Sequence, residues 1–215
     1  MKKFHSIVIF LTTVFCYCIW ITLKELSTIH PIGITILAAT SSIGVYRIIF
    51  NLSAYSVKKW KRIKKIILRD SYFEGTWAGF YYGVNGKVRF FIENFEQDID
   101  NLKMKGITYN ENQQFHSTYF SDYININQNK NEINYLYTVQ SANEYTDGIG
   151  LARFDYFHDT DSPYPSKLLG TTKDKHLNKQ CIGFEIKISD EILDGTENII
   201  KAVEVYEKYK DKIQS

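Results

Sequence analysis

The stretch Tyr72–Tyr82, which reads YFEGTWAGFYY, is the clearest indication of the fold in this 215-residue chain. Glu74–Gly75 is a turn signal, and the residues after it alternate between two faces at the two-residue period of a β-strand. Both faces carry aromatic side chains with small residues between them. Trp77 and Tyr81 share the face that we expect to point inward. Such a strand fits the start of a small closed β-barrel.

The sequence after Tyr82 continues as short strands separated by turns. Turn signals occur at Asn85–Gly86, at Asp147–Gly148 and in the polar run Asn127–Asn131. No helical pattern in this region is long enough for a crossover, so we expect an antiparallel up-and-down barrel of a size that can hold one small ligand. The eight expected strands are Thr76–Tyr82, Lys87–Asn94, Leu102–Tyr109, Phe115–Asp122, Glu132–Gln140, Gly148–Phe157, Lys167–Thr172 and Gln180–Ile188.

The tail Asp190–Ser215 changes to a helical period. Ile199, Val203, Tyr206 and Ile213 form an apolar stripe along it. We expect a C-terminal helix that packs on the outside of the barrel or caps one of its ends.

The chain before Tyr72 has the composition of a membrane segment. An apolar run from Phe4 to Leu23 suffices to cross a bilayer, because about 20 helical residues span roughly 30 Å of hydrocarbon. A second run, Ile32–Leu52, is rich in the small residues that let membrane helices approach closely. A cleaved signal peptide is the alternative for the first run, but no small-residue cleavage site follows it, and Phe15 is too bulky to precede a lipoprotein Cys16. We therefore expect a hairpin of two transmembrane helices.

Charge is distributed unevenly along the chain. Residues 1–70 carry 11 Lys and Arg against two acidic residues, whereas residues 71–215 carry 15 against 22. Many of the N-terminal cations surround Trp60, which is typical of a basic helix at a membrane surface rather than a nucleic-acid patch. With Lys2 and Lys3 on the same side, the positive-inside rule predicts that both termini and the barrel are cytoplasmic.

Four parts follow from these patterns: a hairpin at 1–57, a basic neck at 58–70, a ligand-binding barrel at 71–189 and a helix at 190–215. The Gly-x-Trp at Gly75 is also how lipocalin-like barrels begin. The predicted fold class is a membrane-anchored all-β protein, with two transmembrane helices followed by a cytosolic eight-stranded, antiparallel, lipocalin-like β-barrel and a C-terminal helix.

Enzyme motifs are missing from the sequence. The five histidines are scattered without a nucleophile at a recognisable spacing, and there is no phosphate-binding glycine loop and no Gly-x-Ser-x-Gly. The three cysteines form neither a disulfide framework nor a zinc pattern. His158–Asp161 is interpreted as a polar turn, with a metal site as the alternative. We expect no catalytic residue, metal or cofactor.

The order of two membrane spans, a basic neck and a small β-barrel resembles a family of bacterial anti-phage proteins. These are the two-transmembrane, β-strand-rich effectors of cyclic-oligonucleotide signalling systems (CBASS). The resemblance covers the architecture apart from the C-terminal helix. Four segments carry it: Glu74–Tyr81, Gly148–Phe154, Leu168–Thr171 and Gly183–Ile186.

The resemblance implies a sensor and effector in the bacterial inner membrane. A cognate nucleotidyltransferase senses infection and makes a cyclic dinucleotide, which the barrel binds. The protein then forms a homo-oligomer in the lipid bilayer, and disruption of the membrane kills the infected cell. The expected ligand is thus a cyclic dinucleotide, and nucleic acid is not an expected partner.

A cyclic dinucleotide needs aromatic faces for its bases and cationic groups for its phosphates. Arg89 and Arg153 are the only arginines after residue 70, and Arg153 is the stronger candidate because it lies in a family-like segment. Pairing with an outer carboxylate such as Asp155 is the alternative for Arg153. Trp77 is a candidate that we favour as a plug. The other candidates can stack on bases, donate a hydroxyl or fill the core: Tyr81, Tyr119, Tyr137, Tyr156 and Thr171.

Two other functions remain open from the sequence. A membrane-tethered, lipocalin-like carrier of a lipid or other apolar ligand predicts a barrel interior without arginine. A structural scaffold predicts a barrel filled by its own side chains, for which the 16 Tyr and 14 Phe of the chain offer ample volume.

Overall fold

A computed structural model describes residues 2–27, 31–83, 86–141, 148–175, 180–193 and 198–213. The chain forms two compact units. The first is helical and comprises Met1–Leu68 together with Asp98–Asp100. The second comprises Arg69–Gln97 and Asn101–Ser215 and contains the β-strands.

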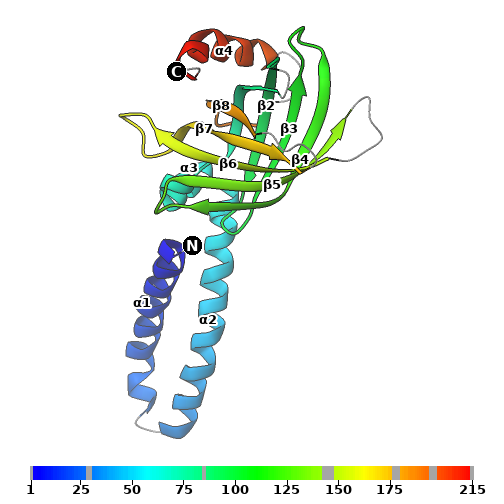
Figure 1. The fold of residues 1–215 in the computed structure, drawn as a ribbon. Helices are drawn as coiled ribbons and strands as arrows, with labels where there is room; N and C mark the ends of the chain where they lie inside the picture. The colour runs from blue at the N-terminus through cyan, green and yellow to red at the C-terminus, as the bar shows by residue number, and fades with distance from the viewer. Residues whose placement is uncertain are drawn as a thin grey trace. The chain divides into compact units, whose positions relative to one another are not determined.

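The helical unit contains α1 (Lys2–Ser27), α2 (Pro31–Lys59) and α3 (Lys61–Leu68). α1 and α2 run side by side (Figure 1). Among the described residues, one helix is long and apolar enough to cross a membrane: α1, over Phe4–Ile21, with a mean hydropathy of 2.0. The predicted helix after Pro31 is present as α2, whereas its crossing of a bilayer stays a prediction.

Both long helices expose large apolar side chains. Phe10 on α1 is 67% exposed, and Ile32 and Ile43 on α2 are 77% and 72% exposed. A small cluster around Phe4 and Val57 is buried within the described part of this unit, and so are Lys64 and Leu68 on α3. Contiguous apolar surface of this kind marks a place where a protein meets lipid or another protein.

The second unit is a closed antiparallel barrel of eight strands, as predicted (Figure 1). Each strand pairs with the next, and β8 pairs with β1 to close the sheet. β2 and β4 extend beyond their predicted ends, to Gln97 and Asn127. The strands are β1 (Gly75–Tyr82), β2 (Val88–Gln97), β3 (Leu102–Tyr109), β4 (Phe115–Asn127), β5 (Glu132–Ser141), β6 (Gly148–His158), β7 (Pro165–Asp174) and β8 (Gln180–Ser189).

The structure describes only some of the residues in the three predicted turns. Asn85 and Asp147 lie outside the described residues. Gly86 has a φ of 72°, a value that suits glycine and a hairpin turn at this point. The polar run after β4 forms the β4–β5 turn, and Asn131 there has a φ of 52°.

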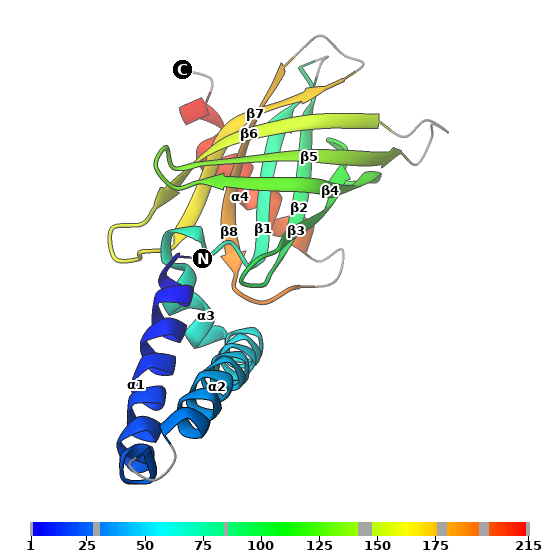
Figure 2. The same cartoon turned by 90° about the horizontal axis from the view of Figure 1, so that it is seen from below.

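The C-terminal helix α4 (Ile199–Ile213) packs on the outside of the barrel, which is one of the two predicted positions (Figure 2). Ala202 and Val205 on α4 are buried in a cluster with Phe80 on β1 and Phe90 on β2. β1 is therefore buried on both faces over most of its length, which explains why its sequence carries aromatic residues on both faces.

One end of the barrel interior is filled by apolar side chains. Trp77 is fully buried there and packs with Phe73 and Phe95. Its indole Nε1 donates a hydrogen bond to the backbone oxygen of Phe73 at 2.9 Å. This position agrees with the predicted plug, and it leaves the other end of the barrel for a pocket.

Candidate functional site

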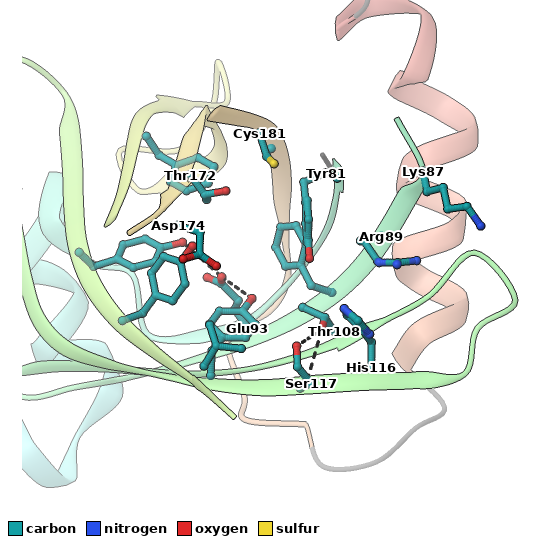
Figure 3. Close-up of a pocket in the computed structure, with 18 residues that line it drawn as sticks. Tyr81, Lys87, Arg89, Glu93, Thr108, His116, Ser117, Thr172, Asp174 and Cys181 are labelled. Carbon is teal, nitrogen blue, oxygen red and sulfur yellow. Dashed lines mark hydrogen bonds between the residues drawn. The ribbon is translucent and has the colours of Figure 1, made fainter. Parts of the chain in front are cut away.

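A pocket with a volume of about 460 Å³ lies inside the barrel (Figure 3). Every strand contributes to its lining. The lining residues lie near the hairpins β1–β2, β3–β4, β5–β6 and β7–β8, which an up-and-down barrel brings to one end. The pocket is thus opposite the end that Trp77 fills.

Inward-facing glycines make room for tyrosine rings that lie across neighbouring strands. Gly106 on β3 pairs in register with Glu93 on β2 and with Tyr119 on β4. A Cβ on Gly106 would overlap the ring of Tyr119. Because Gly106 has no side chain, Tyr119 extends over β3 and reaches Glu93, two strands away.

The same arrangement occurs beside it, where the Tyr137 ring contacts that of Tyr119. A Cβ on Gly150 in β6 would overlap the ring of Tyr137, which extends from β5. A Cβ on Gly79 in β1 would meet the ring of Phe91. The pocket wall is therefore made of aromatic rings that glycines allow to lie flat, and such rings can stack on planar ligand groups.

Cationic and neutral polar groups gather on one side of the pocket. Figure 3 shows Lys87, Arg89 and His116 on this side, with Tyr81 between Arg89 and Glu93. Lys87 Nζ forms an ion pair with Glu111 Oε1 at 2.9 Å. Burial raises the pKa of the Tyr81 phenol to about 12, and the nearby Arg89 guanidinium opposes that rise. Arg89 is half-buried and lines the pocket.

Two carboxyl groups are buried inside the barrel. Glu93 on β2 is 2% exposed, and Glu185 on β8 is fully buried. The Tyr119 hydroxyl donates to Glu93 Oε1 at 2.6 Å and the Tyr135 hydroxyl donates to the same oxygen at 3.2 Å (Figure 3). Burial raises the pKa of both carboxyls, although the two tyrosine hydrogen bonds favour the charged form of Glu93. The charge of Glu93 raises the pKa of Glu185 further.

Four of the predicted ligand residues line this pocket: Arg89, Tyr81, Tyr119 and Tyr137. Trp77 and Tyr156 instead belong to the apolar cluster at the filled end. Thr171 lies on β7 between the inward-facing positions 170 and 172, and Thr172 lines the pocket in its place.

Arg153 does not lie inside the barrel, so the prediction that favoured it over Arg89 needs correction. β6 alternates strictly, with Ala152 and Phe154 buried inside and Arg153 exposed. The Arg153 guanidinium pairs with Glu132 Oε2 at 2.5 Å on the outer surface. The alternative of an outer carboxylate partner is therefore correct in kind, although the partner is Glu132 rather than Asp155.

The sequence interpretation missed the buried acid Glu93 as a pocket residue. The predicted hairpin after Tyr82 could have identified Glu93 as an inward-facing residue. The register pairs Tyr81 with Arg89 and Trp77 with Glu93, so both charged residues share the face of Trp77. Lys87, His116 and Asp174 also line the pocket, but their positions depend on strand ends that the pattern alone does not fix.

Among the described residues, no group of three or more His, Cys, Asp or Glu side chains is arranged to hold a metal ion. Asp159, in the loop considered as a metal site, forms an ion pair with Lys167 at 2.7 Å. No known protein-family model matches the chain, and a search of curated proteins finds no significant match. Any functional conclusion therefore depends on the geometry of the pocket and on the order of the helices and the barrel along the chain.

Proposed function

We propose that the protein is a membrane-anchored receptor whose barrel binds a cyclic dinucleotide. One observation carries this proposal: the pocket combines a half-buried Arg89 and a second cation, Lys87, with walls of tyrosine and phenylalanine rings. Cyclic dinucleotides are anions with planar bases, so they match the cationic side of the pocket and its aromatic walls. The pocket volume of about 460 Å³ is in the range of small-molecule sites, roughly 300–1,000 Å³.

The composition of the pocket disfavours the two other functions. An apolar ligand would desolvate Arg89 without giving it a partner, which is costly for a charged group. A purely structural barrel would close such a space with side chains, as the Trp77 end of the same barrel does. A receptor for a polar, aromatic anion explains both the charges and the space.

The helices supply the second half of the proposal. A receptor tethered by α1, with α2 as a second span, would hold the barrel at the cytoplasmic side of a bacterial inner membrane. Ligand made by a cognate nucleotidyltransferase would favour self-association of the protein, and the membrane would fail in the infected cell. The exposed apolar surface of both helices supports a lipid environment. In this role the barrel binds and signals, and it needs no catalytic group.

Binding measurements on the full chain in lipid nanodiscs test the receptor proposal. The titration panel contains cyclic di- and trinucleotides, with linear dinucleotides as controls. We expect micromolar or tighter binding of one cyclic compound, weakened roughly tenfold or more in Arg89→Ala because a charge-assisted phosphate contact is lost. Arg153→Ala is the matched control, since it removes the other barrel arginine from the outer surface, and its affinity should stay within about twofold. Absence of binding to every compound by the folded protein would refute the proposal.

A further inference from the structure

Two hydrogen-bond donors at the pocket have no partner in the part of the chain that the structure describes. Arg89 on β2 is half-buried, and its guanidinium forms no ion pair or hydrogen bond with another described residue. Tyr81 on β1 also lines the pocket, and its hydroxyl makes no hydrogen bond with a described residue. Unlike the hydroxyl of Tyr156, it is not sealed among other side chains, so a ligand can reach it. Unpaired donors that line a cavity indicate the place of an acceptor.

The two donors come from directly paired residues of neighbouring strands. Tyr81 and Arg89 are partners in the β1–β2 register and lie on the same face as Trp77. The Cβ atoms of such a pair are about 4.5–5.5 Å apart, so both side chains can reach one small group. Burial raises the pKa of the Tyr81 phenol, and the Arg89 guanidinium lies near enough to oppose that rise. Figure 3 shows both side chains at the same side of the pocket.

The Tyr81 hydroxyl is held in place as a donor. Its ring packs against that of Phe91 on β2, with the ring centroids 6.1 Å apart, and the Phe91 ring in turn lies over Gly79. The pKa of the phenol is raised to about 12, so the hydroxyl keeps its proton at neutral pH. A donor that is already positioned loses little freedom when an acceptor binds to it.

The charge at this place fits a monoanion with more than one acceptor oxygen. Lys87 is paired with Glu111, whereas Arg89 has no carboxylate partner among the described residues. Arg89 therefore contributes one uncompensated positive charge, and Tyr81 adds a neutral donor. A guanidinium has donors and no acceptor. A phosphodiester carries one negative charge and two non-bridging oxygens, so it can accept hydrogen bonds from both side chains.

We infer that the Tyr81 hydroxyl and the Arg89 guanidinium together bind one phosphodiester group, each donating to a different non-bridging oxygen of the same phosphate. This inference rests on the proposed function and deepens it. It assigns the Tyr81 hydroxyl to the phosphate and leaves the stacking of bases to other rings of the pocket, such as those of Tyr119 and Tyr137.

Replacement of the non-bridging oxygens by sulfur tests this inference in the full chain in nanodiscs. The probes are cyclic di-AMP, cyclic di-GMP and cyclic GMP-AMP, each compared with its (Rp,Rp) and (Sp,Sp) bis-phosphorothioates. Both phosphates carry sulfur in these analogues, so a compound cannot avoid the change by turning over. Sulfur is a weak hydrogen-bond acceptor. For each parent compound that binds, we expect both diastereomers to bind about threefold to tenfold more weakly, as measured by calorimetric titration.

Two variants separate the hydroxyl from the ring. Tyr81→Phe keeps the ring and removes the donor, so the parent compound should bind about threefold to tenfold more weakly. The sulfur penalty of one diastereomer should then disappear, because its oxygen has already lost its donor. Tyr123→Phe is the matched control, since Tyr123 is 65% exposed on β4, and it should keep the affinities and both penalties of the wild type. Circular dichroism checks that each variant is folded.

The possible outcomes distinguish this inference from the proposed function. Unchanged affinity of the parent compound for Tyr81→Phe would show that Tyr81 contributes its ring alone, which overturns the inference and leaves the receptor proposal standing. Retention of both sulfur penalties in Tyr81→Phe, or their absence in the wild type, would also overturn it. Failure of every cyclic dinucleotide to bind the wild type would overturn both.

Discussion

At the scale of single residues, the pocket contains groups that do not favour stability. Glu93 and Glu185 are buried together in the barrel, and a side-chain hydrogen bond joins the two acids. Apolar side chains of similar volume would pack this space at lower free energy. Buried polar groups of this kind are expected where a site serves binding rather than folding.

The first prediction concerns the dependence of barrel stability on pH. Burial raises the pKa of Glu93 to about 7 in the folded state, whereas an unfolded Glu titrates near 4.3. Between these values the folded state binds more protons than the unfolded state, so the free energy of unfolding falls as pH rises through the window. The contribution of Glu93 to the free energy of unfolding is fully present below the unfolded pKa, and about 3.5 kcal/mol of it is lost by pH 8.

Denaturation of the full chain in detergent at several pH values measures this effect. Trp77 reports barrel unfolding when Trp20 and Trp60 are replaced by Phe. The double variant Glu93→Gln/Glu185→Gln should lose most of the slope between pH 5 and 8, and Glu96→Gln should retain it. Identical pH profiles for the wild type and the double variant would show that these carboxyls are not buried as a pair.

At the scale of elements, α4 gives the barrel an outer core. It covers one face of β1 and parts of β2 and β8 with Ala202, Val205 and the aromatic residues near them. Phe184 on β8 and Tyr209 on α4 lie with their ring centroids 4.8 Å apart. These contacts hold β1, the strand that closes the barrel through its pairing with β8.

A charge placed under α4 should therefore destabilise the barrel. Ala202 is fully buried, so Ala202→Glu should lower the free energy of unfolding by about 3 kcal/mol or more through an unpaired buried charge. Ile200, 59% exposed on the same helix, offers the control: Ile200→Glu should change stability by less than about 1 kcal/mol. Thermal denaturation followed by circular dichroism makes the comparison. Equal melting temperatures for the two variants would mean that α4 does not pack on the barrel as described.

The strands were predictable because their turns and two-residue period are local properties. The inward placement of Arg89 could also have been predicted. A short hairpin after Tyr82 fixes the register of β1 and β2, so Arg89, which pairs with Tyr81, lies on the same face as Trp77. The face on which Arg153 lies could not be predicted, because the number of residues between β5 and β6 does not fix the register. The approach of Tyr119 to Glu93 depends on Gly106 in the strand between them, and only the assembled barrel brings these three residues together.

At the scale of the whole molecule, the chain combines a basic, apolar N-terminal segment with an acidic barrel. Residues 1–70 carry 11 of the 26 Lys and Arg, and the helices there expose apolar side chains. A positive juxtamembrane segment favours an anionic lipid surface. The negative barrel repels an anionic ligand at long range, so Arg89 and Lys87 must supply local attraction.

Deletion of residues 1–57 separates the proposed membrane anchoring from the proposed ligand binding by the barrel. The truncated protein should leave the membrane fraction and become soluble, because the apolar helices are removed, while the second unit retains its own two core clusters. Cell viability should then no longer fall when the ligand is produced in the same bacteria. Killing by the truncated protein would contradict the membrane mechanism. Fractionation and colony counts provide the measurement.

The most direct test of the receptor proposal is an experimental structure of the full chain in complex with the cyclic dinucleotide that binds most tightly. We expect ligand density inside the barrel, with phosphate oxygens within hydrogen-bond distance of Arg89 and a base beside the ring of Tyr119. Ligand bound at the outer surface near Arg153, with the pocket between Arg89 and Glu93 free of ligand, would contradict it.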